Sequence, residues 1–216
     1  MRYEQERQSL IDCALQMKAE QLVKGSGGNV SLRMPDDLVL VTPSAMAYET
    51  MRPEDVVVVD LQGRVVEGGR RPTSDLAAIL YVFRHMPRVR ATIHTHQPYA
   101  TALSLVADEL PADFVTVIDE LNGAVRVAPF TRSSDEGMGV QTVEYAGNSD
   151  AVILKHHGVM ALGTSVQGAL SAAVSLEEGC RCYLAALATG LPVAHLTNEQ
   201  IADEAEERGY YGQPNE

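Results

Sequence analysis

Residues 151–162 read Ala-Val-Ile-Leu-Lys-His-His-Gly-Val-Met-Ala-Leu, an aliphatic stretch interrupted by two histidines and a glycine. Aliphatic and β-branched residues in a short run predict β-structure, and Gly158 at the break predicts a hairpin or a bent strand. The first half, Val152–Leu154, leads into His156 and His157. We therefore expect two imidazoles at the end of a buried strand.

The chain on either side of this stretch alternates short strands with helices. Four consecutive valines, Val56–Val59, predict a strand that is buried on both faces. Further strands are expected at Val30–Arg33, Leu38–Val41, Arg64–Val66, Arg90–His96 and Ala124–Ala128. Helices are expected at Tyr3–Lys24, Asp75–His85, Tyr99–Val106, Glu136–Ala146, Ser165–Thr189 and from a capping box at Thr197 to about Arg208. This order favours an α/β fold, a three-layer α/β/α sandwich around a central, largely antiparallel sheet. The chain has no repeat, linker or low-complexity run, so we expect one domain over residues 1–216.

Composition excludes several classes of protein and of partner. With Gly 17, Pro 10 and Cys 3 in 216 residues, the chain is neither collagen-like, nor disordered, nor stapled by disulfides. A net charge of −12 repels nucleic acid and anionic lipid, so neither is an expected partner. No apolar run approaches the ~20 residues that span a bilayer. The polar start of the chain, Met1–Arg7, and the odd number of cysteines predict a cytoplasmic protein.

Four of the six histidines form two groups that suggest a metal site. In the expected strand Arg90–His96, alternation places His94 and His96 on one face, about 7 Å apart. Only one of the adjacent His156 and His157 can join that face, while the other points away. A third imidazole completes a three-histidine site with an open position, as catalytic zinc requires. The alternative is a set of ordinary core and surface histidines.

Three further segments carry groups that suit an anion. The loop Gly25–Ser31 (Gly-Ser-Gly-Gly-Asn-Val-Ser) can direct backbone N–H groups at a phosphate, although a helix end followed by a turn explains it equally well. It matches neither a P-loop nor a dinucleotide fingerprint. Thr42-Pro43-Ser44-Ala45 ends a strand, and Pro72-Thr73-Ser74-Asp75 opens a helix, where hydroxyl and N–H groups favour anions. The helix dipole alone can explain Asp75.

Taken together, these motifs resemble the class II aldolase and adducin family, which includes L-fuculose-phosphate aldolases and L-ribulose-5-phosphate 4-epimerases. The resemblance runs from about Glu4 to Thr189 and rests on five motifs in order: Gly27–Ser31, Thr42–Ser44, Pro72–Asp75, His94–His96 and His156–Gly158. It implies a divalent metal, zinc or else manganese or cobalt, held by His94, His96 and His156. It implies that Asp75 ligates the resting metal and moves protons. It implies a substrate-phosphate pocket made of Gly28, Asn29, Ser44, Ala45, Thr73 and Ser74.

The same resemblance implies a homotetramer with its sites between subunits, into which a C-terminal tyrosine, Tyr210 or Tyr211, reaches from the neighbour. The implied activity is a zinc-dependent retro-aldol cleavage of a phosphorylated ketose to glycerone phosphate and an aldehyde. An epimerase remains the alternative, because Asp75 replaces the usual aldolase Glu and Asp119 fits an epimerase catalytic position. The short interval from His96 to His156 favours the aldolase. A sugar-acid phosphate decarboxylase and a non-catalytic adducin-like module are further alternatives.

Overall fold

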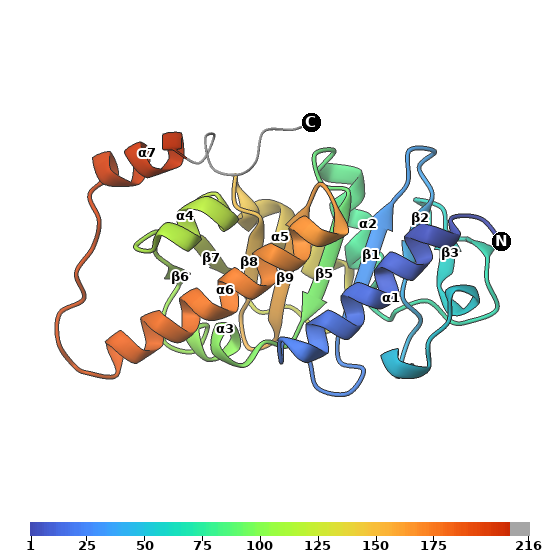
Figure 1. Ribbon diagram of the computed structural model, residues 1–216, viewed down its shortest axis with the longest axis horizontal. Helices are drawn as coiled ribbons and strands as arrows, with labels where there is room; N and C mark the ends of the chain where they lie inside the picture. The colour runs from blue at the N-terminus through green and yellow to red at the C-terminus, as the bar shows by residue number, and fades with distance from the viewer. Residues whose placement is uncertain (208–216) are drawn as a thin grey trace.

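The computed structural model describes residues 1–207, and in this part of the chain nine strands form one sheet (Figure 1). The strands are β1 (Asn29–Arg33), β2 (Val39–Val41), β3 (Val57–Val59), β4 (Val65–Glu67), β5 (Ala91–Thr95), β6 (Glu109–Leu110), β7 (Val125–Ala128), β8 (Ala151–Leu154) and β9 (Gly158–Gly163). Their order across the sheet is β4-β3-β2-β1-β5-β9-β8-β7-β6. Neighbours are antiparallel except for β7 and β8, which run parallel. The expected largely antiparallel sheet is confirmed.

Helices cover both faces of this sheet. They are α1 (Glu4–Ala19), α2 (Leu76–His85), α3 (Pro98–Leu103), α4 (Val115–Leu121), α5 (Glu136–Ala146), α6 (Val166–Leu187) and α7 (Asn198–Glu207). In Figure 1, α1 and α6 cross the front of the sheet, whereas α2 and α5 lie behind it. The valine run shows the two faces directly: Val56 and Val58 belong to one buried cluster, Val57 and Val59 to the other, and all four have 0% exposure. The expected α/β/α sandwich is therefore the observed fold.

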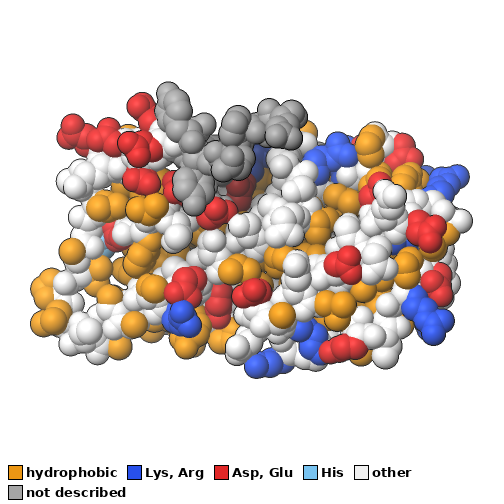
Figure 2. All heavy atoms as spheres, in the orientation of Figure 1, with side chains coloured by type: hydrophobic (Ala, Val, Ile, Leu, Met, Phe, Trp, Pro, Cys, Tyr) orange, Lys and Arg blue, Asp and Glu red, His pale blue; other side chains and the backbone are white. Residues whose placement is uncertain are grey.

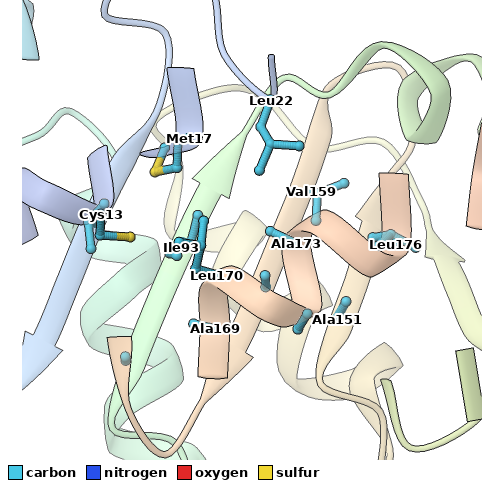
Figure 3. Close-up of a cluster of buried hydrophobic side chains, with 14 of the residues drawn as sticks. Cys13, Met17, Leu22, Ile93, Ala151, Val159, Ala169, Leu170, Ala173 and Leu176 are labelled. Atoms are coloured by element: carbon cyan, nitrogen blue, oxygen red, sulfur yellow. The ribbon is translucent and has the colours of Figure 1, made fainter. Parts of the chain in front are cut away.

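Small residues allow α6 to lie close to the sheet. Figure 3 shows Ala169, Leu170, Ala173 and Leu176 of this helix packed among side chains from α1, β5, β8 and β9. The helix begins at the cap residue Ser165, whose hydroxyl accepts a hydrogen bond from the Gly168 N–H (3.0 Å).

Two elements were not expected from the sequence: the short strand β6 and the helix α4. The first is only two residues long, and the second is built from β-branched residues that pack against α6. The other elements agree with expectation to within a few residues, including the Thr197–Gln200 capping box, in which each backbone N–H donates to the other side chain (2.9 and 3.2 Å). None of the helices in residues 1–207 is long and apolar enough to cross a membrane.

Candidate active site

Three imidazoles meet at one end of the sheet. His94 and His96 come from β5 and the residue that follows it, and His157 comes from the turn between β8 and β9. One ring nitrogen of each lies within 4.8 Å of those of the other two. The Nε2 atoms of His94 and His96 are 3.2 Å apart. Two ligands of one tetrahedral zinc ion, each at about 2.0–2.1 Å, would be separated by about 3.4 Å.

The sequence assigned the third position to His156, and this assignment is wrong. Its backbone is in the left-handed region (φ 60°), and its ring lies near Phe130 (centroids 6.4 Å apart) rather than in the cluster. His157 takes the place instead, with its ring centroid 4.9 Å from that of His94. The turn between β8 and β9 reverses the alternation that a continuous strand would give, so the second of the two adjacent histidines faces β5.

Close contact between β5 and β9 fixes the cluster. A Cβ on Gly158 would lie 2.1 Å from the Thr95 carbonyl oxygen, so only glycine allows the strands to approach at this point. The ring of His94 is held from behind, since its Nδ1 lies 2.8 Å from the Val159 carbonyl oxygen. A carbonyl can only accept, so Nδ1 carries the proton and Nε2 presents its lone pair to the other imidazoles.

The environment keeps these rings neutral. Burial lowers the pKa of His94, and the adjacent His157 and His96 lower it further, against an opposing effect of Asp75. Burial likewise lowers the pKa of His157, with a further contribution from His96. A metal binds the neutral form of imidazole, so the donor set suits a divalent cation that prefers nitrogen.

Asp75 adds a carboxylate to the cluster. It is the residue before α2, and one of its oxygens, Oδ2, lies 4.0 Å from His94 Nε2. The same oxygen accepts a hydrogen bond from the Asn29 side-chain amide (2.8 Å). Asn29 pairs with His94 across β1 and β5, so the amide that holds the carboxylate is in register with the histidine. The residues present thus fit a divalent metal held by three imidazoles, with a carboxylate close by.

A cavity of about 240 Å³ opens beside the cluster. All six residues expected to bind phosphate line it, together with Asp75 and the three clustered histidines: Gly28, Asn29, Ser44, Ala45, Thr73 and Ser74. The structure therefore brings the glycine loop, the end of β2 and the start of α2 to one place. Gly28 leaves no room for a side chain, because a Cβ there would lie 2.7 Å from the His94 carbonyl oxygen. Among the described lining residues there is no lysine or arginine.

Sequence reasoning missed two residues of this cavity, Ser133 and Ser134, which precede α5. The Ser134 hydroxyl lies 3.4 Å from Asp75 Oδ1, and the Ser134 backbone is left-handed (φ 61°). Left-handed non-glycine residues gather at functional sites, and Ala45 (φ 55°), on the same cavity, is another. The only sequence signal was a polar loop ahead of a helix.

Two other expected site residues are not brought to this cavity. Asp119 lies half-buried on α4, and it is not among the residues that line the cavity. Its role in a site shared with another subunit stays a prediction. Tyr210 and Tyr211 lie outside the described residues.

The fold and the motifs define the class of protein. The chain belongs to the class II aldolase and adducin family, since the family model described as "Class II Aldolase and Adducin N-terminal domain" matches residues 8–184.

Individual relatives fall on both sides of the aldolase–epimerase divide. The chain is 31% identical to a 5-deoxy-D-ribulose 1-phosphate aldolase of Bacillus thuringiensis serovar kurstaki, over 99% of this chain and 100% of the relative. It is 32% identical to an L-ribulose-5-phosphate 4-epimerase of Salmonella paratyphi C, over 96% of this chain and 98% of the relative. The solved structure of an L-fuculose 1-phosphate aldolase superimposes with a TM-score of 0.87 and 30% identity, over 93% of this chain and 94% of that one.

Proposed function

We propose that the protein is a zinc-dependent aldolase that cleaves a phosphorylated ketose by retro-aldol chemistry to glycerone phosphate and an aldehyde. The observation that carries this proposal is the shared cavity, which joins a three-imidazole cluster to the residues expected to bind phosphate. Sugar phosphates carry both groups that such a cavity suits: a carbonyl with an adjacent hydroxyl, and a phosphate.

The phosphate end of the cavity is built from dipoles rather than from charged side chains. The hydroxyls of Ser44, Thr73 and Ser74 and the first turn of α2 face it. A helix N-terminus carries partial positive charge and exposed N–H donors, which together favour a phosphate. Placing the phosphate there directs the carbonyl end of a short ketose towards the histidine cluster.

In the retro-aldol step, the carbon–carbon bond beside the hydroxyl-bearing carbon breaks and its electron pair passes towards the carbonyl oxygen. The hydroxyl proton leaves to a base, and a proton later returns to the carbon that lost its partner. A divalent metal held by His94, His96 and His157 would stabilise the negative charge on oxygen. Asp75 lines the cavity beside His94, so its carboxylate is the described group best placed to carry the proton.

The rival activity is a 4-epimerase, which breaks the same kind of bond and re-forms it on the other face of the aldehyde. An aspartate rather than a glutamate at position 75 favours it, as does the epimerase relative. Cleavage followed by release separates the aldolase from this rival. We also propose a cytoplasmic location and a homotetramer, in which a tyrosine from the C-terminal end of a neighbour completes the site.

The test is proton NMR of glycerone phosphate in D2O with metal-loaded protein, before and after addition of a chelator. The aldolase predicts loss of one carbon-bound proton signal, and the chelator should stop that loss. If the zinc-loaded protein exchanges no proton, the aldolase proposal fails. Conversion of L-ribulose 5-phosphate to its 4-epimer would then establish the alternative.

A further inference from the structure

Asp75 is held at both oxygens by groups from different parts of the chain. The Asn29 amide donates to Oδ2, which is the oxygen 4.0 Å from His94 Nε2. The Ser134 hydroxyl faces the other oxygen, Oδ1, at 3.4 Å. The carboxylate is 8% exposed, so solvent has little access to replace either partner.

The loop that carries Ser134 is fixed to the helix that Asp75 precedes. At the start of α5, Asp135 accepts a hydrogen bond from the Gly137 N–H (2.7 Å) and so caps that helix. Gly139 of α5 packs on α2 so closely that a Cβ would lie 2.4 Å from the Ala78 carbonyl oxygen. Glu136 and Arg84 form an ion pair between the two helices (2.8 Å). Hence the separation of Ser134 and Asp75 depends on helix packing rather than on a free loop.

The backbone of Ser134 is left-handed, which costs of order 1–3 kcal/mol for a residue other than glycine or asparagine. The conformation directs the hydroxyl into the cavity towards Asp75, so the strain coincides with a contact to the carboxylate that the proposed chemistry uses. An aspartate has one methylene fewer than a glutamate and therefore less freedom to find its own orientation. A second hydrogen-bond donor compensates for this by restricting rotation of the carboxyl group.

We propose that Ser134 is a positioning residue, which donates a hydrogen bond to Asp75 Oδ1 and so keeps Oδ2 directed at the histidine cluster and the substrate. This role rests on the proposed function for its catalytic consequence, but the contact itself does not. Ser134 would affect proton transfer more than substrate binding, because it acts through the carboxylate and not on the phosphate.

The first test is a double-variant cycle in the metal-free protein. Urea unfolding is followed for Ser134→Ala, Asp75→Asn and the double variant. We expect the midpoint shift of the double variant to be smaller than the sum of the single shifts, because the second change removes an interaction already lost. Ser171 provides a matched control, since its hydroxyl donates to the Glu120 carboxylate (2.8 Å) on the remote contact between α6 and α4. Ser171→Ala and Asp75→Asn should give additive shifts. Additive shifts for Ser134 as well would overturn the proposal.

The second test is the rate of proton exchange into glycerone phosphate. Ser134→Ala should lower the maximal rate about tenfold, the loss expected for one hydrogen bond to a charged group, with KM and bound zinc changed less than about twofold. Ser134→Thr, which keeps the hydroxyl, should recover most of the rate, and Ser171→Ala should be normal. A raised KM at an unchanged maximal rate would assign Ser134 to binding and contradict a positioning role. If wild-type protein exchanges no proton, the proposed function fails, and the unfolding cycle still decides whether Ser134 holds Asp75.

Discussion

At the scale of single residues, two adjacent histidines separate a ligand from a bystander. His157 belongs to the cluster, whereas His156 lies near Phe130. We predict that His157→Ala lowers zinc affinity by more than the about 10- to 100-fold that loss of an outer partner costs. His156→Asn should leave it unchanged, because asparagine tolerates the left-handed backbone there. Competition with a fluorescent chelator measures both. The opposite pattern would restore His156 as the ligand that the family resemblance implied.

Gly158 makes a second residue-scale prediction. A methyl group at this position meets the Thr95 carbonyl oxygen, and relieving that contact must separate β9 from β5 between the cluster histidines. Gly158→Ala is therefore expected to lower the free energy of unfolding by about 1–3 kcal/mol and to weaken zinc binding. Gly69→Ala is the control, because no atom lies within 4 Å of its Cβ position. Urea unfolding measures both variants, and equal stabilities would show that the strands accommodate the methyl group.

At the scale of elements, α6 supports the turn that follows His96. The Glu177 carboxylate on α6 accepts hydrogen bonds from the N–H groups of Tyr99 and Ala100 at the start of α3 (2.9 and 3.0 Å). The buried Gln97 donates to the Ala173 carbonyl oxygen (2.7 Å) and accepts from the Thr95 hydroxyl (2.7 Å). The segment that carries His96 is thus fastened to a long helix on the other side of the site.

Glu177 also gives a pH prediction. Burial raises its pKa above the ordinary 4.5, so the folded protein binds more protons than the unfolded chain just above that pH. Stability from this group is therefore present at lower pH and is lost as the pH rises through the raised pKa. Glu177→Gln removes this dependence. In urea unfolding of metal-free protein, the stability difference, wild type minus variant, should decrease from pH 4.5 towards neutrality. An increase would mean that the two N–H donors outweigh burial.

Elements with a local signal could be predicted from the sequence, and those set by distant packing could not. The valine run, the Thr197 capping box and the His-x-His pair each depend on periodicity or on neighbours in the chain. The helix α4 depends instead on contact with α6, where a Cβ on Gly179 would lie 2.9 Å from Val117. In the site, the face of His94 and His96 follows from alternation.

The choice between His156 and His157 depends on one backbone angle at a turn, which the sequence does not reveal. Ser134 was missed for a related reason. It lies 59 positions from Asp75 along the chain, and only the packing of α5 on α2 brings the two together.

At the scale of the whole molecule, an acidic protein is proposed to bind an acidic substrate. The net charge is −12, and Figure 2 shows acidic side chains gathered over α7 at the upper left. The described cavity residues include no lysine or arginine to offset this field. Phosphate binding would then rest on hydroxyls, N–H groups and the dipole of α2, all of which act over short distances. Long-range electrostatics would oppose the approach of a phosphate dianion.

This balance predicts an unusual salt dependence. Raising ionic strength from about 10 mM to about 150 mM shortens the Debye length from about 30 Å to about 8 Å, which screens the distant acidic groups but not the contacts inside the cavity. We therefore expect KM for glycerone phosphate in the exchange reaction to fall a few-fold, with an unchanged maximal rate. Initial rates in a salt whose anion binds weakly would measure this, and the maximal rate serves as the internal control. A KM that rises with salt would instead require cationic side chains at the phosphate. Since none lines the described cavity, such a rise would place them on a neighbouring subunit or in the chain beyond residue 207.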